Sequence, residues 1–155
     1  MKPAVAPDPS VAAEAPLLEV RDLKTHLFTD EGVVRAVDGV DFTVPAGKTV
    51  CLVGESGCGK SMTARSIMQI VPPPGKVISG QVNLQRENGA ILDLAALDPK
   101  GREIRKIRGR EIAMIFQEPM SSLSPVHTIG NQVLETIRLH LTIGPAEAKR
   151  RALQS

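Results

Sequence analysis

The chain has 155 residues, of which 42% are apolar and 23% charged, and its formal net charge is +2. This length is that of about one domain, and the composition is ordinary for a soluble globular protein. With three Phe and no Trp or Tyr, the chain has few rings on which bases could stack. Its small net charge also argues against a nucleic-acid partner. No apolar run reaches the ~18 residues that a membrane-spanning helix needs.

The N-terminal residues 1–16 contain four prolines and mostly small residues, which predicts a flexible tail. They include no continuous apolar segment of the kind found in a secretory signal. The two cysteines, Cys51 and Cys58, lie in one short stretch, so they form no disulfide framework and fit a reducing compartment better. These observations predict a protein of the cytosol.

From Leu17 onwards the first half of the chain has strand-like patterns. Apolar or β-prone residues alternate over residues 18–27, and again over residues 40–44, which predicts two strands. The stretch 49–53 forms an unbroken apolar run, typical of a strand buried on both faces of a parallel sheet. Residues 60–71 then predict a helix that the prolines and glycine of residues 72–75 end.

The second half mixes short elements with longer helices. Residues 77–84 predict a strand, residues 91–97 a short strand or helical turn, and residues 99–108 a short basic helix. A further apolar run covers residues 112–116 and has Gln117 at its end. Apolar residues recur every fourth position from Ile129 to Leu141, which predicts a helix. The pair at 144–145, glycine then proline, ends that helix and begins another.

A glycine-spaced loop lies between the apolar run 49–53 and the helix at 60–71. It matches the pattern G-x-x-x-x-G-K-[ST] with Gly54, Glu55, Ser56, Gly57, Cys58, Gly59, Lys60 and Ser61. Glycines let successive N–H groups converge on phosphates, and the following helix adds its positive end. Lys60 would then reach the β- and γ-phosphates, and the Ser61 hydroxyl would bind Mg²⁺. We expect residues 54–61, with Met62, to bind a nucleotide.

The alternative is that the loop is a glycine turn that only joins a strand to a helix. Four fixed positions at the correct spacing, with a strand pattern before and a helix pattern after, favour nucleotide binding. The pattern itself does not distinguish ATPases, GTPases and kinases. A GTPase would carry a guanine-reading N-K-x-D motif, which this sequence lacks.

Three segments around the loop carry a family resemblance: residues 36–42, residues 53–57 and above all residues 114–130. From about Leu17 to its end, the chain resembles the ATP-binding subunits of dipeptide and oligopeptide ABC importers. The resemblance implies an α/β fold, the RecA-like P-loop NTPase core of an ABC ATPase. It further implies an N-terminal antiparallel β subdomain, an incomplete sheet, and the start of a helical subdomain. Residues 17–155 would form a partial nucleotide-binding domain, with a Q-loop at 117–128 and the helical subdomain at 129–155.

The resemblance also implies ligands and partners. The nucleotide would be ATP with Mg²⁺, and Gln117 would be the Q-loop glutamine that contacts the magnesium and the attacking water; alternatively it is a polar strand-end residue. Phe28 lies where the family places an aromatic ring on adenine, although a core or strand-edge Phe is nearly as good an interpretation. Residues 119–128 would face the coupling helix of a permease, or form a rigid exposed loop.

As a member of this family, the protein would pair with a second, identical or different, ATP-binding subunit. The pair would sit under two permease subunits on the inner face of a bacterial cell membrane. Di- or oligopeptides as the solute follow from the resemblance alone, because relatives of the same ATPase serve nickel and glycoside import.

Three later motifs of the family are not found in the sequence. Residues 78–81, Ile-Ser-Gly-Gln, lie too early for the LSGGQ-type signature and are expected to be part of a strand. Residues 90–93 lie in the wrong position for a Walker B strand, and Leu94 follows where the family has Glu. We expect His26, His127 and His140 to be surface or loop histidines rather than the switch histidine.

These departures predict a truncated product that holds nucleotide but turns it over very slowly, because the water-orienting carboxylate is missing. They also predict an unpaired apolar strand edge and marginal stability. Two alternatives stay open: a non-catalytic fragment that pairs with a full-length subunit, and a remnant that does not fold by itself. The basic clusters at 105–110 and 149–151 are interpreted as solvated helix faces. A minor hypothesis is that alkylation of Cys58 blocks ATP binding.

Overall fold

The computed structural model describes residues 16–117 and 123–154, so the predicted flexible tail lies almost entirely outside the described residues. The chain divides into two compact units, one up to Pro99 and one from Lys100 onwards.

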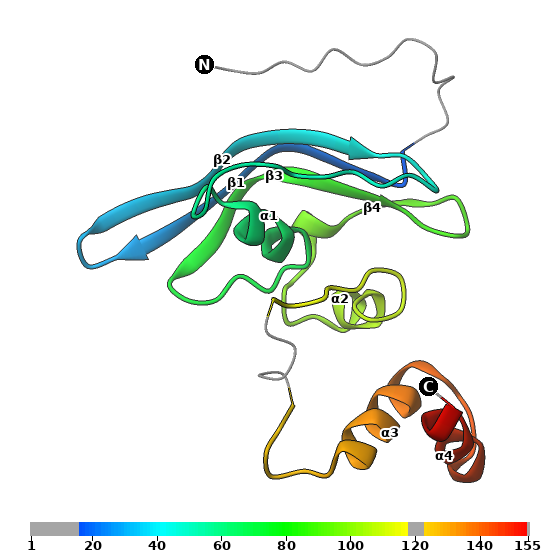
Figure 1. Cartoon of the computed structure of the whole chain (residues 1–155). Helices are drawn as coiled ribbons and strands as arrows, with labels where there is room; N and C mark the ends of the chain where they lie inside the picture. Colours follow the sequence, from blue (N-terminus) through cyan, green and yellow to red (C-terminus); the bar gives the residue numbers. More distant parts are fainter. Residues whose placement is uncertain (1–15, 118–122, 155) are drawn as a thin grey trace. The chain divides into compact units, whose positions relative to one another are not determined.

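The first unit is built on a four-stranded antiparallel sheet (Figure 1). The strands are β1 (Leu18–Thr29), β2 (Gly32–Val44), β3 (Gly75–Gln85) and β4 (Ile91–Asp93), in the order β2-β1-β3-β4. Helix α1 (Lys60–Ile67) lies against the sheet, and a 3₁₀ turn, η1 (Leu94–Ala96), follows β4 directly. The strands predicted at 18–27, 40–44 and 77–84 are confirmed, and residues 91–97 combine both predicted forms, a short strand and a helical turn.

Strands β1 and β3 are the two inner strands of the sheet, and β1 contributes more fully buried side chains to the core of this unit than any other element. Its buried positions follow the alternation that the sequence shows. The fully buried side chains of the unit are those of Val20, Leu23, Thr25, Ser66, Val82 and Leu94. They come from β1, α1, β3 and η1, so the core ties the helix and the 3₁₀ turn to the sheet.

The alternation of β1 shifts by one residue between Val20 and Leu23, where the pairing with β2 and β3 is also displaced. Asp22 has a φ of 43° at this bulge. On β3, Gly80 has a φ of 109°, and a Cβ at this position would lie 2.5 Å from the Cα of Leu23 and 2.7 Å from the carbonyl oxygen of Asp22. Only glycine fits beside the bulge. Gly80 is therefore a sheet residue, which confirms that residues 78–81 belong to a strand.

The strand predicted at 49–53 is wrong. These residues form no strand, and their apolar side chains are exposed, with Val53 92% and Leu52 45% exposed. A strand needs a neighbour to complete its hydrogen-bond ladder, and no described residue pairs with this run. The run 112–116 behaves similarly: Ile112 makes one isolated bridge with Arg108, and Ile115 is 92% exposed.

Helix α1 is shorter than the predicted 60–71. It ends at Ile67, with Met68 as its C-cap, and Gln69 follows with a φ of 53°. A residue in the left-handed region reverses the chain and ends a helix. The stop therefore lies before the prolines that the sequence favoured as the helix breaker.

The second unit contains three helices among its described residues: α2 (Arg102–Ile107), α3 (Ile129–His140) and α4 (Pro145–Gln154). All three were predicted, although α2 is shorter than the predicted 99–108. Helices α3 and α4 pack against each other, and Ala148 of α4 is fully buried. In α4, hydrogen bonds from Arg150 and then Arg151 hold the pKa of Glu147 below its ordinary value.

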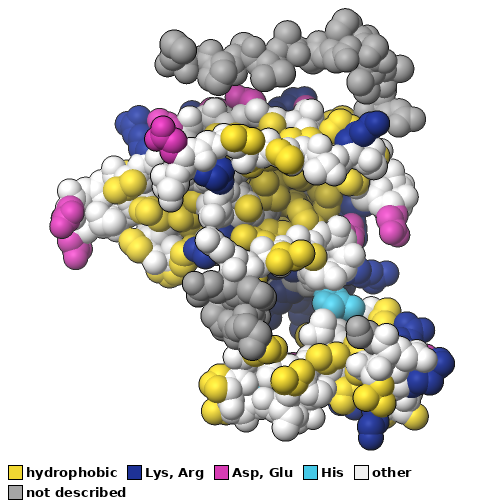
Figure 2. Space-filling model, viewed as in Figure 1, with side chains coloured by type: hydrophobic (Ala, Val, Ile, Leu, Met, Phe, Trp, Pro, Cys, Tyr) yellow, Lys and Arg dark blue, Asp and Glu magenta, His cyan; other side chains and the backbone are white. Residues whose placement is uncertain are grey.

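Apolar side chains also reach the surface. Figure 2 shows apolar side chains grouped over the first unit on the visible face. The exposed apolar residues include Val33, Val34, Val50, Leu52 and Val53. Among the described residues, no helix has both the length and the apolar character needed to cross a bilayer.

Candidate nucleotide-binding site

The glycine-spaced loop has the backbone shape that its sequence predicts. Gly57 and Gly59 have φ values of 82° and 93°, conformations that L-residues adopt only with strain. Residues 54–58 are exposed, whereas Gly59 is half-buried. A Cβ at Gly59 would collide with the carbonyl oxygen of Ala36 in β2. The glycine thus lets the end of the loop approach the sheet closely while the rest faces solvent.

The ammonium group of Lys60 folds back over this loop. Its Nζ donates to the carbonyl oxygens of Gly54 and Glu55, at 2.8 and 2.6 Å, and to the Sγ of Cys58 at 3.4 Å. The positive charge is therefore held at the centre of the loop by the loop itself. An ammonium group in this position can exchange these neutral acceptors for anionic phosphate oxygens, which bind it more strongly.

The first turn of α1 adds further donors. Gly59 is its N-cap and supplies no side-chain cap, so the first N–H groups of the helix lack a capping side chain. The first turn also contains no acidic residue, which leaves the positive end of the helix dipole uncompensated. Ser61, in this turn, is exposed, and its hydroxyl is free to face a ligand. Such a helix end is suited to bind phosphate.

A buried hydroxyl pair holds α1 on the sheet. The Oγ of Ser66 donates to the carbonyl oxygen of Met62 at 2.7 Å and lies 2.7 Å from the Oγ1 of Thr25 in β1. Since Ser66 has one hydroxyl proton, Thr25 must be the donor of the second bond. Sequence reasoning missed this pair. The signal was a threonine at an apolar position of β1, which is an unexpected residue type for a buried site.

The predicted site residues are brought together only in part. Residues 54–62 form one continuous loop and helix start, and Phe28 lies in the same unit, near the end of β1, with 45% of its surface exposed. Its ring centroid is 6.5 Å from that of His26. Gln117 is exposed and belongs to the second unit, so its contact with Mg²⁺ and water stays a prediction. Part of the predicted Q-loop, residues 118–122, lies outside the described residues.

The three histidines differ from one another. His26 is a half-buried residue of β1, not a surface or loop residue, and no described residue hydrogen-bonds to its buried Nε2. His26 lies within the sheet, because it pairs with Arg35 of β2 on one side and with Lys76 of β3 on the other. His127 is an exposed loop residue, as predicted, whereas His140 is half-buried at the end of α3.

A second feature, in the other unit, is the loop that precedes α3. Gln132 of α3 makes three hydrogen bonds to its backbone: Oε1 accepts from the N–H of Ser124 at 2.8 Å, and Nε2 donates to the carbonyl oxygens of Ser124 and His127 at 3.1 and 3.0 Å. Sequence reasoning overlooked Gln132, because a polar residue within a helix is normally expected to face solvent. The loop lies within residues 119–128, the segment predicted to face a permease.

Comparison with known proteins identifies the family. The family model described as "ABC transporter" matches residues 37–154, more than half of the chain. The chain belongs to the ABC transporter family. The match includes both the glycine-spaced loop and the loop before α3, so the two features belong to one ABC sequence. The predicted resemblance is confirmed.

Curated relatives refine this placement within the ABC family. The chain is 47% identical over 139 residues to the probable peptide ABC transporter ATP-binding protein y4tR of Sinorhizobium fredii, covering 89% of the chain and 39% of the relative. It is 46% identical to the oligopeptide transport ATP-binding protein AppD of Bacillus subtilis, again over 89% of the chain, and covers 40% of that relative. The chain thus spans about two fifths of the length of these ABC proteins.

Solved structures confirm the ABC ATPase fold. The dimeric structure of the ABC transporter cassette MJ0796 matches with a TM-score of 0.71 at 23% identity, over 88% of this chain and 54% of that one. A post-hydrolysis state of the same cassette with ADP and phosphate matches with a TM-score of 0.67 at 22% identity. The predicted fold class, an ABC ATPase portion with an N-terminal antiparallel sheet, is therefore confirmed.

Proposed function

We propose that this chain binds ATP with Mg²⁺ through residues 54–62 and serves as part of the nucleotide-binding component of a peptide importer. One observation carries the ATP proposal: an ammonium group, Lys60 Nζ, is held inside a loop of positive-φ glycines at an uncapped helix N-terminus. The backbone N–H groups of a glycine-rich loop, the positive end of a helix dipole and one ammonium group together make a site for a chain of phosphates. Ser61 would then supply a hydroxyl ligand to Mg²⁺.

Relatives support the peptide-import part of this proposal. The two described above are named as a peptide and an oligopeptide transport ATP-binding protein. By this likeness, ATP hydrolysis in the whole protein would drive the uptake of peptides. The protein would act on the inner face of the cell membrane, where residues 117–128 would contact the permease subunits. A second ATP-binding subunit is proposed as well, since the related cassette forms a dimer in its solved structure.

Calorimetry with Mg-ATP tests the nucleotide site directly. We expect the unmodified chain to bind, and Lys60→Ala to lower the affinity at least about a hundredfold, because a charge-assisted hydrogen bond to phosphate is lost. Lys48→Ala is the matched control: Lys48 is an exposed lysine outside the loop, and its loss removes the same charge without touching the site.

Lys60→Ala also removes the hydrogen bonds that Lys60 makes within the loop, so a thermal melt must show that the variant still folds. Equal ATP affinity in the unmodified chain and in a folded Lys60→Ala variant would refute the proposed site. A second titration adds GTP at the same concentration as ATP. Displacement of ATP by GTP would show that the site recognises the phosphates and not the base, whereas no displacement would show that the site is specific for ATP.

Gln117 is proposed to orient the Mg²⁺ and the attacking water. Its position at the end of the apolar run 112–116, before the permease-facing segment, supports this role. If it does so, Gln117→Ala should change the Mg²⁺ dependence of ATP binding while leaving binding of ATP without Mg²⁺ unaltered. An unchanged Mg²⁺ dependence would leave Gln117 as a polar loop residue.

A further inference from the structure

We propose that Gln132 is a positioning residue, which fixes the loop before α3 in the shape that docks on the permease subunits. The inference rests on the permease contact in the proposed function above and names a residue that sets it. The loop is defined here as residues 123–128 and is called the α3 loop.

The side-chain amide of Gln132 acts on the α3 loop like an extra peptide group. It accepts from the N–H of Ser124 and donates to the carbonyl of the same residue, at 2.8 and 3.1 Å, and its second donor reaches the carbonyl of His127 at 3.0 Å. Both amide hydrogens are thereby used. The three bonds join the two sides of the turn, from Ser124 to His127, to a single rigid helix.

Other contacts complete the same arrangement. The Oγ of Ser124 lies 2.9 Å from the Nδ1 of His127, which closes the turn from the outside. Thr128 caps α3 by accepting from the N–H of Asn131 at 3.3 Å. The turn is therefore fastened to the helix at both ends.

The result is a firmly held loop with apolar side chains directed to solvent. Val126, between Ser124 and His127, is 83% exposed, Leu123 at the start of the loop is 37% exposed, and Ile129, the first residue of α3, is 65% exposed. Gln132 already satisfies the N–H and carbonyl of Ser124 and the carbonyl of His127, so these polar groups are not available to a partner, whereas the apolar side chains are. It can dock on an apolar surface without first losing conformational freedom, which favours binding.

Gln132→Glu is the sharpest test, because it keeps the size of the side chain and removes both donors. The carboxylate would face two carbonyl oxygens, so the three-bond arrangement cannot form. Close to the N-terminus of α3, however, a negative charge favours the helix dipole. The substitution therefore releases the α3 loop without weakening the helix. Gln132→Met, uncharged and of similar size, separates the loss of hydrogen bonds from charge repulsion.

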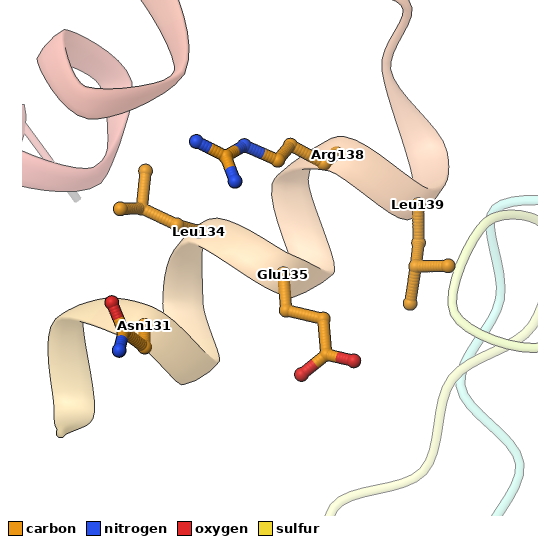
Figure 3. A pocket seen from close by; sticks show the side chains of 5 residues that line it. All are labelled: Asn131, Leu134, Glu135, Arg138 and Leu139. Atoms are coloured by element: carbon orange, nitrogen blue, oxygen red, sulfur yellow. The ribbon is translucent and has the colours of Figure 1, made fainter. Parts of the chain in front are cut away.

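Asn131→Asp is the matched control. It adds the same charge to the neighbouring residue, whose side chain lies with Leu134, Glu135, Arg138 and Leu139 around a surface hollow of about 490 Å³ (Figure 3). Among the described residues, the side chain of Asn131 makes no hydrogen bond to the α3 loop; only its backbone N–H does, to Thr128. A thermal melt of each variant checks that it is folded.

Hydrogen exchange gives the first readout. Exchange of the Ser124 amide should rise about tenfold or more in both Gln132 variants. In Gln132→Met the acceptor of this amide is lost. In Gln132→Glu the carboxylate is displaced from it by repulsion from the two carbonyl oxygens. Exchange in the last two turns of α3 should stay unchanged, and Asn131→Asp should resemble the unmodified chain. Unchanged exchange at Ser124 in both Gln132 variants would overturn the proposal.

Binding to co-expressed, detergent-solubilised permease subunits gives the second readout. Gln132→Glu and Gln132→Met should each weaken the complex about tenfold, because the released loop must be ordered again on binding, whereas Asn131→Asp should not. Val126→Asp should also weaken it, but without raising exchange at Ser124, because it removes an apolar contact and leaves the turn intact.

The two proposals fail in different ways. If the unmodified chain does not bind the permease subunits, the proposed partner is wrong. If the unmodified chain binds and the Gln132 variants bind equally well, the partner stands and only the positioning role of Gln132 is overturned.

Discussion

Single side chains set the geometry of the glycine-spaced loop. Lys60 is fixed at the loop centre by the carbonyls of Gly54 and Glu55, and Gly59 can approach Ala36 only because it has no Cβ. Phe28 and Cys58 lie outside the set of residues that the phosphate pattern requires. Each of the two can be tested separately from phosphate binding.

Phe28→Ala should weaken ATP binding about tenfold if the ring stacks on adenine, since a base–aromatic stack contributes about 1–3 kcal/mol. Inorganic tripolyphosphate has no base, so its affinity should not change. Calorimetry with both ligands makes the comparison within one variant. Equal affinity for ATP before and after the substitution would leave Phe28 as an exposed strand-edge residue.

Alkylation of Cys58 by iodoacetamide should lower ATP affinity at least about tenfold, because an adduct would crowd the loop that phosphates must enter. The Sγ lies 3.4 Å from the Nζ of Lys60, and it would be 2.7 Å from a Cβ at Gly54. Labelling is measured by mass spectrometry in a Cys51→Ser background, because both cysteines are exposed. Full ATP binding by completely labelled protein would show that Cys58 is only a spacer.

At the scale of elements, the β-bulge of β1 is the main irregularity of the sheet. It shifts the apolar alternation by one residue between Val20 and Leu23, so both residues face the core. Gly80 of β3 makes room for the bulge, and the buried bond between Thr25 and Ser66 then fixes α1 on the same strand. The position of α1, and of the glycine-spaced loop that precedes it, thus depends on the shape of β1.

Gly80→Ala should destabilise the first unit by roughly 3 kcal/mol, because the added Cβ meets backbone atoms and φ is positive. Gly89→Ala is the control: Gly89 has a φ of 79°, but a Cβ added there would have no neighbour within 4 Å, so only the conformational cost of about 1 kcal/mol applies. Urea denaturation followed by circular dichroism measures both. Equal losses in the two variants would mean that the bulge tolerates a side chain.

At the scale of the whole molecule, the chain has one unit with the glycine-spaced loop and a second unit with the α3 loop. A ligand that binds only the folded form stabilises it by mass action. Nucleotide binding should therefore be visible in the unfolding of the unit that contains residues 54–62.

Mg-ATP at about 100 times its dissociation constant should raise the free energy of unfolding by about 2.7 kcal/mol. The midpoint temperature for unfolding of the unit that contains residues 54–62 should rise accordingly. Mg-AMP, which lacks the β- and γ-phosphates, should have little effect. Differential scanning calorimetry measures the shift, with Lys60→Ala as the control. An equal shift with Mg-AMP would show that the site does not read the phosphate chain.

The geometry of the glycine-spaced loop could be predicted from the sequence because its parts are adjacent in the chain. Residues 54–61 carry their own geometry: two glycines with positive φ, a lysine that bends back, and the first turn of a helix. The strand patterns of β1 and β3 and the period of α3 were equally local, so they too predicted the elements correctly. Family-specific residues at 114–130 then identified the ABC family, which the family model confirmed.

Tertiary structure decided what depends on residues far apart in the chain. The apolar run 49–53 is no strand, because a strand needs a partner and no described residue supplies one. The pairing of β1 with β3, the close approach of Gly80 to the bulge, and the buried bond between Thr25 and Ser66 join residues separated by 41 positions or more. Gln132 shows the same limit over eight residues: its helix position was predictable, but its three bonds required the chain to turn back on itself. Periodicity and motifs report local conformation, whereas pairing and packing are settled only when the distant partner is in place.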